Sequence, residues 1–580
     1  MTLPVRSIQA EFSATLVDEW SRAGVRHCVI SPGSRSSAMA IALLANTRMQ
    51  THLRLDERSG AFFALGLALS TREPVLIVTT SGTATTELHA AVVEADQARV
   101  PLVVVTADRP VELHHVGAPQ TIDQSTLFGG SLRFHLDLPV AEEATRRHWR
   151  SFASRLVAEA VAGGRGPGPV HCNLAFREPM VGAVVALPKG RDFGRPWHEA
   201  VREVAVSAAV LDRFLDEIEG ISRGVVIAGG TPLDEYEGIL AFAGARGWPV
   251  LADARAIPRR EEATLIAHAD QFLRDTATVD RLEPEVIVHL GSPHASKTLM
   301  GWNERWAERG IPHLFVDPFG TYEDPERYGE LFLAAEPNAL LALSAAVDTG
   351  VNCEESWLQR WRECDAKTAI VLEQILDAGV LCEPAIAREV HRALTDDDTL
   401  FCSSSMPIRD VEWFAAARDD APRVLANRGA NGIDGVVSSI LGVAADTHGR
   451  TIGLIGDLAL LHDLSGFVWG STEVVPNATL VLIDNAGGGI FSFLSYPGLV
   501  DRPLFERGFA TPQRADLPAL LRGFGVGVIV VESLAGLHDA LVETSSASGI
   551  HVIVARTDRE ANVEIHRAIA AAVADAIAVN

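Results

Sequence analysis

Two segments in the last third of the chain end in residues whose oxygen atoms suit a metal ion and a phosphate. One apolar run ends at Gly456 and Asp457, and the next ends at Asn485, just before glycines 487–489. One strand–helix–strand unit fits between them, so both side chains are expected at the same edge of a sheet. Mg²⁺ binds carboxylate and carbonyl oxygens and keeps phosphate oxygens among its ligands, while glycines let the backbone approach closely. The pair predicts a metal–diphosphate site, whereas Gly-Asp alone is typical of a turn.

An acidic residue at the start of an apolar segment is the second candidate. Glu57 lies between Asp56 and Arg58 and precedes Ser-Gly-Ala-Phe-Phe-Ala-Leu-Gly-Leu-Ala-Leu, which indicates a helix buried nearly all round. A carboxylate in the first turn has a structural explanation, because it complements the positive end of the helix dipole. The alternative is an acid kept in a dry pocket for chemistry. The residues alone leave both interpretations open.

These candidates need strands to position them. Apolar, β-branched runs bounded by Gly, Pro or Asp indicate buried parallel strands, and helical patterns such as 7–23 and 85–98 lie between them. The predicted strands lie within 27–33, 74–82, 100–110, 224–230, 248–254, 286–292, 312–318, 398–405, 451–457, 479–485 and 551–558. The alternation predicts an α/β chain of three doubly wound parallel-sheet domains, at 1–187, 199–345 and 365–580. No Gly-x-Gly-x-x-Gly follows a strand, so a dinucleotide fingerprint is absent.

Bulk composition argues against several classes of protein. The 580 residues carry a formal net charge of −25, which argues against nonspecific nucleic-acid binding. No uncharged apolar stretch approaches the ~18 residues of a membrane helix, and the first residues lack the order of a signal peptide. The cysteines show no Cys-x-x-Cys and no zinc spacing, so reduced cysteines in a cytoplasmic protein are expected. They are Cys28, Cys172, Cys353, Cys364, Cys382 and Cys402.

The segments "GDLALLHDL" (456–464) and "IDNAGGGIF" (483–491) together resemble the diphosphate–magnesium motif of thiamin diphosphate (ThDP)-dependent enzymes. The resemblance covers the whole chain and implies the domain order pyrimidine-binding, middle, diphosphate-binding. It implies ThDP and Mg²⁺ as cofactors, with Mn²⁺ as an acceptable substitute, and Asp457, Asn485 and the Gly487 carbonyl as metal ligands. It also implies that Glu57 hydrogen-bonds the pyrimidine N1′ and transfers a proton to the ring. The implied cofactor-binding residues are Glu57, Ile433, Gly456, Asp457, Leu458, Asn485, Gly487, Gly488 and Ile490.

Further motifs resemble one branch of these enzymes, which works in menaquinone (vitamin K2) biosynthesis. They are "SPGSRSS", "DERSGAFFALGLA", "TSGTATTELHAAVVEA", "TADRP", "GAPQTID" and "NRGANGIDG". Leu458 stands where the general pattern often has Gly and agrees with this branch, and Ala486 replaces an Asn but leaves Asn485 intact. The branch implies a transferase that decarboxylates 2-oxoglutarate and adds the resulting carbanion to isochorismate in a 1,4 sense.

Both implied substrates are dianions, so their site needs fixed cations, and arginine suits carboxylates. Cations follow several predicted strands of this acidic chain, although each arginine alone is more typical of a surface charge or loop anchor. The expected substrate-binding residues are Ser34, Arg35, Arg109, Gln120, Lys297, Ser405, Arg409, Arg428, Asn431 and Phe491. From position alone, we expect Lys297 and Arg409 to face 2-oxoglutarate. Arg35 and Arg109 are expected to face isochorismate.

Two expectations concern assembly and regulation. In the resembled enzymes the pyrimidine and diphosphate domains come from different subunits, which implies a homodimer at least and a dimer of dimers as the usual assembly. Arg99 lies beside a predicted buried strand and is expected to form a structural ion pair with Glu94 or Asp96. A regulatory anion site at Arg99, for a downstream naphthoate, is the alternative.

Two alternative functions stay open. The first is another ThDP-dependent reaction, either 2-keto acid decarboxylation or an acetohydroxyacid-type synthesis, which predicts fewer cations around the site. The second is a non-catalytic ThDP-binding sensor, which predicts loss of the pyrimidine glutamate or of the metal ligands. Glu57, Asp457 and Asn485 are all present, which disfavours the sensor.

Overall fold

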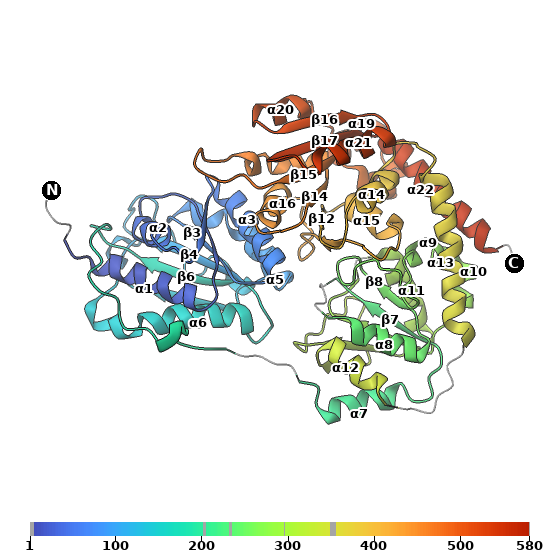
Figure 1. Ribbon diagram of the computed structural model, residues 1–580, viewed down its shortest axis with the longest axis horizontal. Coiled ribbons are helices and arrows are strands. Elements are labelled where there is room, and N and C mark those ends of the chain that lie inside the picture. The colour runs from blue at the N-terminus through green and yellow to red at the C-terminus, as the bar shows by residue number, and fades with distance from the viewer. Residues whose placement is uncertain (1–4, 201–204, 231–234, 295, 348–354, 579–580) are drawn as a thin grey trace.

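The computed structural model describes residues 5–200, 205–230, 235–294, 296–347 and 355–578. Three parallel sheets follow one another along the chain, and helices alternate with the strands of each (Figure 1). This confirms the predicted α/β class with three doubly wound sheets. Cys353 and part of the segment expected to separate the second and third domains lie outside the described residues, and the exact domain limits stay predictions. None of the described helices is long and apolar enough to cross a membrane.

The N-terminal sheet has the strand order β2-β1-β3-β4-β6-β5. Its strands are β1 (His27–Ile30), β2 (Gln50–Leu53), β3 (Val75–Thr79), β4 (Leu102–Asp108), β5 (Phe134–Leu138) and β6 (Val170–Ala175). Its helices are α1 (Ile8–Arg22), α2 (Ser37–Leu44), α3 (Glu57–Thr71), α4 (Thr83–Thr86), α5 (His89–Gln97) and α6 (Trp149–Ala162). The order reverses between β1 and β3, and ligands of such sheets bind beyond the carboxyl ends of strands at this point.

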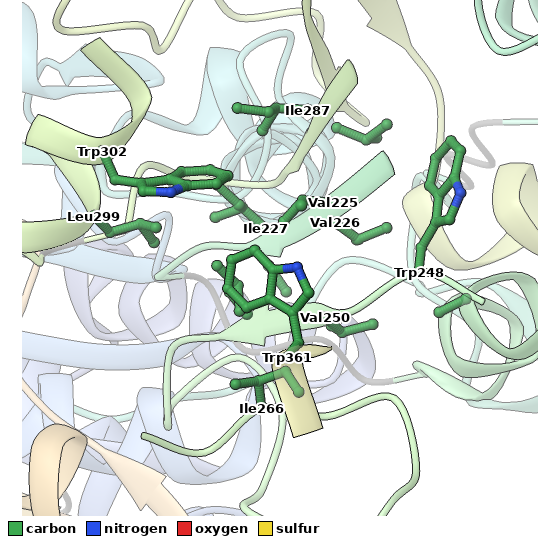
Figure 2. Packing of buried hydrophobic residues seen from close by; sticks show 14 of the residues in the cluster. Val225, Val226, Ile227, Trp248, Val250, Ile266, Ile287, Leu299, Trp302 and Trp361 are labelled. Carbon is green, nitrogen blue, oxygen red and sulfur yellow. The ribbon is translucent and has the colours of Figure 1, made fainter. Parts of the chain in front are cut away.

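The middle sheet has the order β11-β10-β9-β7-β8. Its strands are β7 (Gly224–Ala228), β8 (Val250–Ala252), β9 (Val286–Leu290), β10 (His313–Asp317) and β11 (Leu331–Ala334). Its helices are α7 (Ala208–Glu217), α8 (Glu237–Arg246), α9 (Ala269–Phe272), α10 (Thr276–Arg281), α11 (Lys297–Glu308) and α12 (Pro337–Ala345). Figure 2 shows Trp248, Trp302 and Trp361 around β7, and all three side chains are buried.

The C-terminal sheet has the order β13-β12-β14-β15-β17-β16. Its strands are β12 (Thr399–Cys402), β13 (Arg423–Leu425), β14 (Thr451–Gly456), β15 (Ala478–Asp484), β16 (Gly527–Val531) and β17 (Ile550–Arg556). Its helices include α14 (Glu383–Arg392), α15 (Met406–Phe414), α16 (Val436–Ala444), α17 (Asp457–His462), α18 (Tyr496–Leu499), α19 (Arg502–Phe505), α20 (Leu517–Gly523) and α21 (Leu534–Thr544). The order reverses between β12 and β14, so the loops after these strands are the expected ligand crevice.

Two long helices join the middle and C-terminal sheets. Helix α13 (Glu355–Leu376) runs beside the C-terminal helix α22 (Arg559–Ala578) at one side of the molecule (Figure 1). Trp357 and Trp361 of α13 share one buried cluster with Ile569 of α22 and with the middle sheet. This apolar continuity indicates that the two domains pack as one unit.

The N-terminal and C-terminal domains meet where α3 crosses α16 at very short range. A Cβ at Gly66 of α3 would lie 2.1 Å from the Ser439 carbonyl oxygen, and a Cβ at Gly442 of α16 would lie 2.2 Å from the Phe63 carbonyl oxygen. No Cβ tolerates such distances, so glycine on each helix permits the approach. Residues 59–68 of α3 are buried, which confirms the helix expected to be covered nearly all round.

Arg99 forms its ion pairs with residues of another domain. The prediction that it pairs with Glu94 or Asp96 is therefore wrong. Its guanidinium pairs with Asp317 at 2.6 Å and Glu323 at 2.5 Å, both in the middle domain. Asp96 pairs instead with Arg133. Arg99 adopts a φ of 55°, which directs the chain away from α5 after the helix has ended.

The buried His52 gives the fold an expected pH dependence. It packs against Phe63 of α3 (ring centroids 5.2 Å apart), and burial, followed by the charges of His27 and Arg54, lowers its pKa to about 3. An exposed histidine titrates near pH 6.5. As the pH falls, His52 therefore binds a proton near pH 6.5 in the unfolded chain but only near pH 3 in the folded protein. The stability that this contributes is present above pH 6.5 and is lost as the pH falls toward 3, by up to about 1.4 kcal/mol per pH unit.

Urea unfolding between pH 7.5 and 5 measures this effect. We expect His52→Gln to lose less stability than the wild type over that range, because the substituted side chain does not titrate. Parallel losses in the two proteins would show that His52 is not responsible.

Candidate active site

The predicted metal ligands lie together at the carboxyl edge of the C-terminal sheet. Asp457 follows β14 and opens α17; its Oδ1 accepts a hydrogen bond from the Leu458 N–H and its Oδ2 accepts one from the Gly487 N–H, both at 2.7 Å. Asn485 follows the adjacent strand β15. Burial raises the pKa of Asp457 to about 6, since no hydrogen bond here carries a full positive charge. A cation at this position would stabilise the carboxylate.

Asn485 supplies the observation that tests whether a metal fits. Its side chain is buried, its Nδ2 donates to Glu383 Oε1 at 2.8 Å, and its Oδ1 is buried without a hydrogen-bond partner. Buried polar atoms are nearly always satisfied, so an orphaned acceptor beside a carboxylate indicates a missing positive ligand. Carboxylate, amide and backbone oxygens are the donor set of a hard cation such as Mg²⁺.

The glycines after Asn485 fold into a turn that side chains would block. Gly487 has a φ of 131°, and a Cβ there would lie 2.2 Å from the Ala510 carbonyl oxygen. The Gly488 N–H donates to that same oxygen at 2.7 Å. Ile490 and Phe491 follow, half-buried, and the Phe491 ring lies 5.8 Å from that of Phe509. Gly456 and Leu458 are also half-buried beside Asp457. The turn therefore presents backbone groups and apolar side chains to the same space.

Glu57 is not the N-cap of its helix, although as the first residue of α3 it still complements the positive end of the helix dipole. Asp56 is the N-cap of α3, and its carboxylate accepts a hydrogen bond from the Ser59 N–H at 3.1 Å. Burial raises the pKa of Glu57, and the nearby charges of Asp56 and Glu87 add to the rise. An acid that burial makes reluctant to ionise is suited to proton transfer.

The N-terminal substrate candidates form one group around two arginines. Arg109 donates to Gln120 Oε1 at 3.2 Å, and Arg35 lies close enough to lower the pKa of Arg109, an effect second to that of burial. Arg35 Nε and Arg109 Nη1 are buried and have no hydrogen-bond partner. Ser34 is exposed beside them. Orphaned donors on two arginines favour a bound anion.

The C-terminal candidates form a second group. Ser405 has a φ of 77° and precedes α15, and Arg409 in the first turn of α15 donates to the Ser405 carbonyl. Burial, together with the charges of Arg255 and Arg409, lowers the pKa of Arg428 to about 10, and Arg428 Nε is buried without a partner. Arg409 was expected in a loop and instead lies on a helix, where the helix backbone fixes its position.

Among the described residues, no hydrogen bond or ion pair joins Lys297, Asn431 or Ile433 to either group. Lys297 is exposed at the start of α11, not in the loop after β9 where it was expected. Asn431 is exposed with a φ of 63°, and Ile433 packs partly against the cluster shared by the N-terminal and C-terminal domains. Glu57 makes no hydrogen bond or ion pair with the metal-binding edge among the described residues. Its helix does touch the end of α17, through Ser59 Oγ and Asp463 Oδ1 at 3.1 Å.

Three glutamates, of which Glu94 and Glu383 are buried and Glu412 is half-buried, support the site and were missed by sequence reasoning. Glu94 of α5 accepts hydrogen bonds from the N–H groups of Gly429 and Ala430, at 2.6 and 2.7 Å, and so holds the loop that carries Arg428. Glu383 holds Asn485, as described above. Glu412 of α15 pairs with Arg259 (2.8 Å) and accepts from the Ala254 N–H (2.8 Å), which ties α15 to the middle domain. The only available signal was an acid within an apolar helical pattern.

Two family models match the chain. One, described as "Thiamine pyrophosphate enzyme, N-terminal TPP binding domain", matches residues 10–127; the other, described as "Middle domain of thiamine pyrophosphate", matches residues 195–402. Thiamine pyrophosphate is a synonym of ThDP. The described residues contain no group of three or more His, Cys, Asp or Glu that could hold a metal. The chain belongs to the ThDP-dependent enzymes.

Full-length relatives narrow the assignment. Each is named 2-succinyl-5-enolpyruvyl-6-hydroxy-3-cyclohexene-1-carboxylate (SEPHCHC) synthase. The Myxococcus xanthus protein is 39% identical and the alignment covers 97% of both chains. The Thermobifida fusca protein is 38% identical over 97% of this chain and 98% of its own, and the Bacillus velezensis protein is 36% identical over 98% and 97%. Within the ThDP-dependent enzymes, the chain is a member of the SEPHCHC synthase family.

Proposed function

We propose that this chain catalyses the SEPHCHC synthase reaction of menaquinone biosynthesis. 2-Oxoglutarate loses CO₂, and the remaining four-carbon unit adds to the conjugated alkene of isochorismate in a 1,4 sense, which makes the enzyme a transferase. The observation that carries the proposal is the buried, unpartnered Asn485 Oδ1 beside Asp457, because it fits a metal-bound diphosphate. The two separate arginine groups fit two dicarboxylate substrates.

The cofactor would be held by residues of two domains. Asp457, Asn485 and the Gly487 carbonyl would hold Mg²⁺, or Mn²⁺ in its place, and through it the diphosphate. Gly456, Leu458, Gly488 and Ile490 would line that end, and Ile433 would support the bent cofactor. When bound, ThDP supplies the electron sink for decarboxylation. Glu57 would share its proton with the pyrimidine N1′, which its raised pKa favours.

The two arginine groups would bind different substrates. Arg35 and Arg109, with Ser34 and Gln120, would bind the carboxylates of isochorismate. Lys297 and Arg409, with Ser405, would bind 2-oxoglutarate. The remaining candidates, Arg428, Asn431 and Phe491, would complete the site between them. Single buried nitrogens without hydrogen-bond partners support this role, since a bound carboxylate would satisfy them; they are Arg35 Nε, Arg109 Nη1 and Arg428 Nε.

The direct test is an assay with both substrates. Purified protein should release CO₂ and form the adduct from 2-oxoglutarate and isochorismate only when ThDP and Mg²⁺ are both present. Turnover of pyruvate in place of 2-oxoglutarate, with no adduct formed, would instead support the alternative ThDP-dependent reactions.

Arg109→Ala should separate the two halves of the reaction. Loss of a charge-assisted carboxylate contact costs about 1.5–3 kcal/mol, roughly 10- to 100-fold. We therefore expect the apparent KM for isochorismate to rise by about that factor. CO₂ release from 2-oxoglutarate alone, followed in a single turnover, should survive. Arg177→Ala is the control, because Arg177 lies at the same edge of the sheet but is exposed and paired with Glu112 at 2.6 Å.

An Arg109→Ala enzyme in which CO₂ release falls as far as overall turnover would contradict this division. Arg109 would then serve 2-oxoglutarate or the cofactor, and the two arginine groups would not correspond to two substrates.

The proposed enzyme is a cytoplasmic homodimer or a dimer of dimers. The proposal of a dimer is compatible with the described residues, among which no hydrogen bond or ion pair joins Glu57 to the metal-binding edge of the same chain. Analytical ultracentrifugation of the cofactor-bound protein tests this, and a monomer with full activity would contradict it.

A further inference from the structure

Asn485 can bind a metal ion through only one end of its side chain. The asparagine amide has an oxygen that accepts and an NH₂ group that donates, and the two ends have nearly the same shape. Only the oxygen can ligate a cation, so half a turn of the amide would abolish ligation. Asp457 has two equivalent carboxylate oxygens, so either orientation of its side chain presents an oxygen to the metal.

Glu383 distinguishes the two ends of the Asn485 amide. It is the first residue of α14, and its Oε1 accepts the hydrogen bond from Asn485 Nδ2 at 2.8 Å. Both side chains are buried. In this arrangement the amide NH₂ faces a carboxyl oxygen that accepts its hydrogen bond. The opposite end, Oδ1, is then left buried and without a hydrogen-bond partner.

Other contacts hold this pair in place. Thr557, which follows β17, donates its hydroxyl to Glu383 Oε1 at 3.3 Å and its N–H to the Asp484 carbonyl at 3.0 Å. Gly489 leaves space for the amide, because a Cβ there would lie 2.7 Å from Asn485 Nδ2. The carboxyl ends of β15 and β17 and the start of α14 thus fix one orientation of Asn485.

We propose that Glu383 is a positioning residue that orients Asn485 so that its oxygen faces the metal. The inference rests on the proposed function, since it needs Asn485 to be a ligand. A merely structural role predicts that removing Glu383 destabilises the fold. The positioning role predicts lost metal affinity with no loss of stability.

Mn²⁺ binding to the full chain, followed by the electron paramagnetic resonance signal of free Mn²⁺ with ThDP in excess, tests the proposal. We expect Glu383→Ala to weaken Mn²⁺ binding about 10- to 100-fold, as when the outer partner of a metal ligand is lost. The urea midpoint of the cofactor-free protein in EDTA should not fall. Glu389→Ala is the matched control, because Glu389 is buried on the same helix but pairs with His538 at 2.8 Å. It should bind Mn²⁺ like the wild type.

Exchanging the amide of Asn485 and the carboxylate of Glu383 gives a second, independent test. Asn485→Asp places two carboxylates against each other and should bind Mn²⁺ poorly. In the double variant Asn485→Asp/Glu383→Gln, the glutamine can donate to the new carboxylate, and we expect affinity to recover by about tenfold or more. No recovery, or a Glu383→Ala affinity within about twofold of the wild type, overturns the proposal.

Asn485→Ala distinguishes failure of the positioning proposal for Glu383 from failure of the proposed metal site itself. If Asn485→Ala abolishes Mn²⁺ binding while Glu383→Ala retains it, the metal site stands and Glu383 does not position it. If Asn485→Ala also binds like the wild type, the metal lies elsewhere and both proposals are wrong.

Discussion

Asp457→Ala is expected to abolish ThDP binding at ordinary Mg²⁺ concentrations. Asp457 is the only carboxylate among the three proposed ligands, so without it the phosphate charge is poorly neutralised. Removing one partner of a buried charge interaction costs about 2–5 kcal/mol, which is roughly 30- to 5,000-fold in affinity. Calorimetric titration of the variant with ThDP at fixed Mg²⁺ measures the loss directly.

The cofactor-free fold should survive the substitution. Burial raises the pKa of Asp457 to about 6, so the ionised carboxylate destabilises the protein in the absence of a cation. Asp484→Ala is the control for general charge effects, because Asp484 lies at the same sheet edge but is only half-buried, 3.9 Å from Arg556. Unchanged ThDP affinity in Asp457→Ala would place the metal ligand elsewhere.

Glu57→Gln is expected to reduce turnover by about 100-fold or more, the scale of one general acid–base contribution. Glutamine has the same shape and can still hydrogen-bond the pyrimidine, so ThDP should bind with little loss. The N-cap of α3 is Asp56, so the helix and its burial should be unaffected. Steady-state turnover, together with ThDP affinity, measures the two effects separately.

Two outcomes would contradict the role of Glu57. Turnover close to that of the wild type would show that the proton is handled elsewhere. A large loss of folding stability or of ThDP affinity, matching the loss of turnover, would show that the acid is structural.

Most of the strands that the sequence predicted correctly lie inside a sheet, the edge strand β8 being the exception. Every predicted run is a strand, including β1, β3 and β4 of the N-terminal sheet. The missed strands are β2, β5, β6, β11, β13 and β16, and all except β6 lie at the edge of a sheet. Polar residues interrupt the apolar pattern of the partly covered edge strands β2 and β5. This does not explain β11 and β16, which are apolar throughout and were still missed. Strand β6 is central, but His171 and Asn173 interrupt its apolar pattern.

Residues of the candidate site could be predicted where a side chain able to bind a metal directly follows a strand. Asp457 and Asn485 were found because each follows an apolar run and their spacing matches one strand–helix–strand unit. Glu94 was not found, because its partners Gly429 and Ala430 are more than three hundred positions away in the sequence. The role of such an acid depends on tertiary packing, which no local pattern encodes. Arg99 illustrates the same limit, since its acidic partners lie in another domain and not in its own helix.

The crossing of α3 and α16 restricts how such an enzyme can change its substrates. At Gly66 and Gly442 the backbones of the two helices approach so closely that any larger residue would force them apart. Helix α3 begins at Glu57, and α16 follows the loop that contains Ile433, so a displacement of either helix would shift one of these proposed cofactor-binding residues. Substitutions in the loops that carry Arg35, Arg109 and Arg428 are therefore expected to disturb the fold less than substitutions at this helix crossing. Efforts to alter specificity by mutation should leave the two glycines untouched.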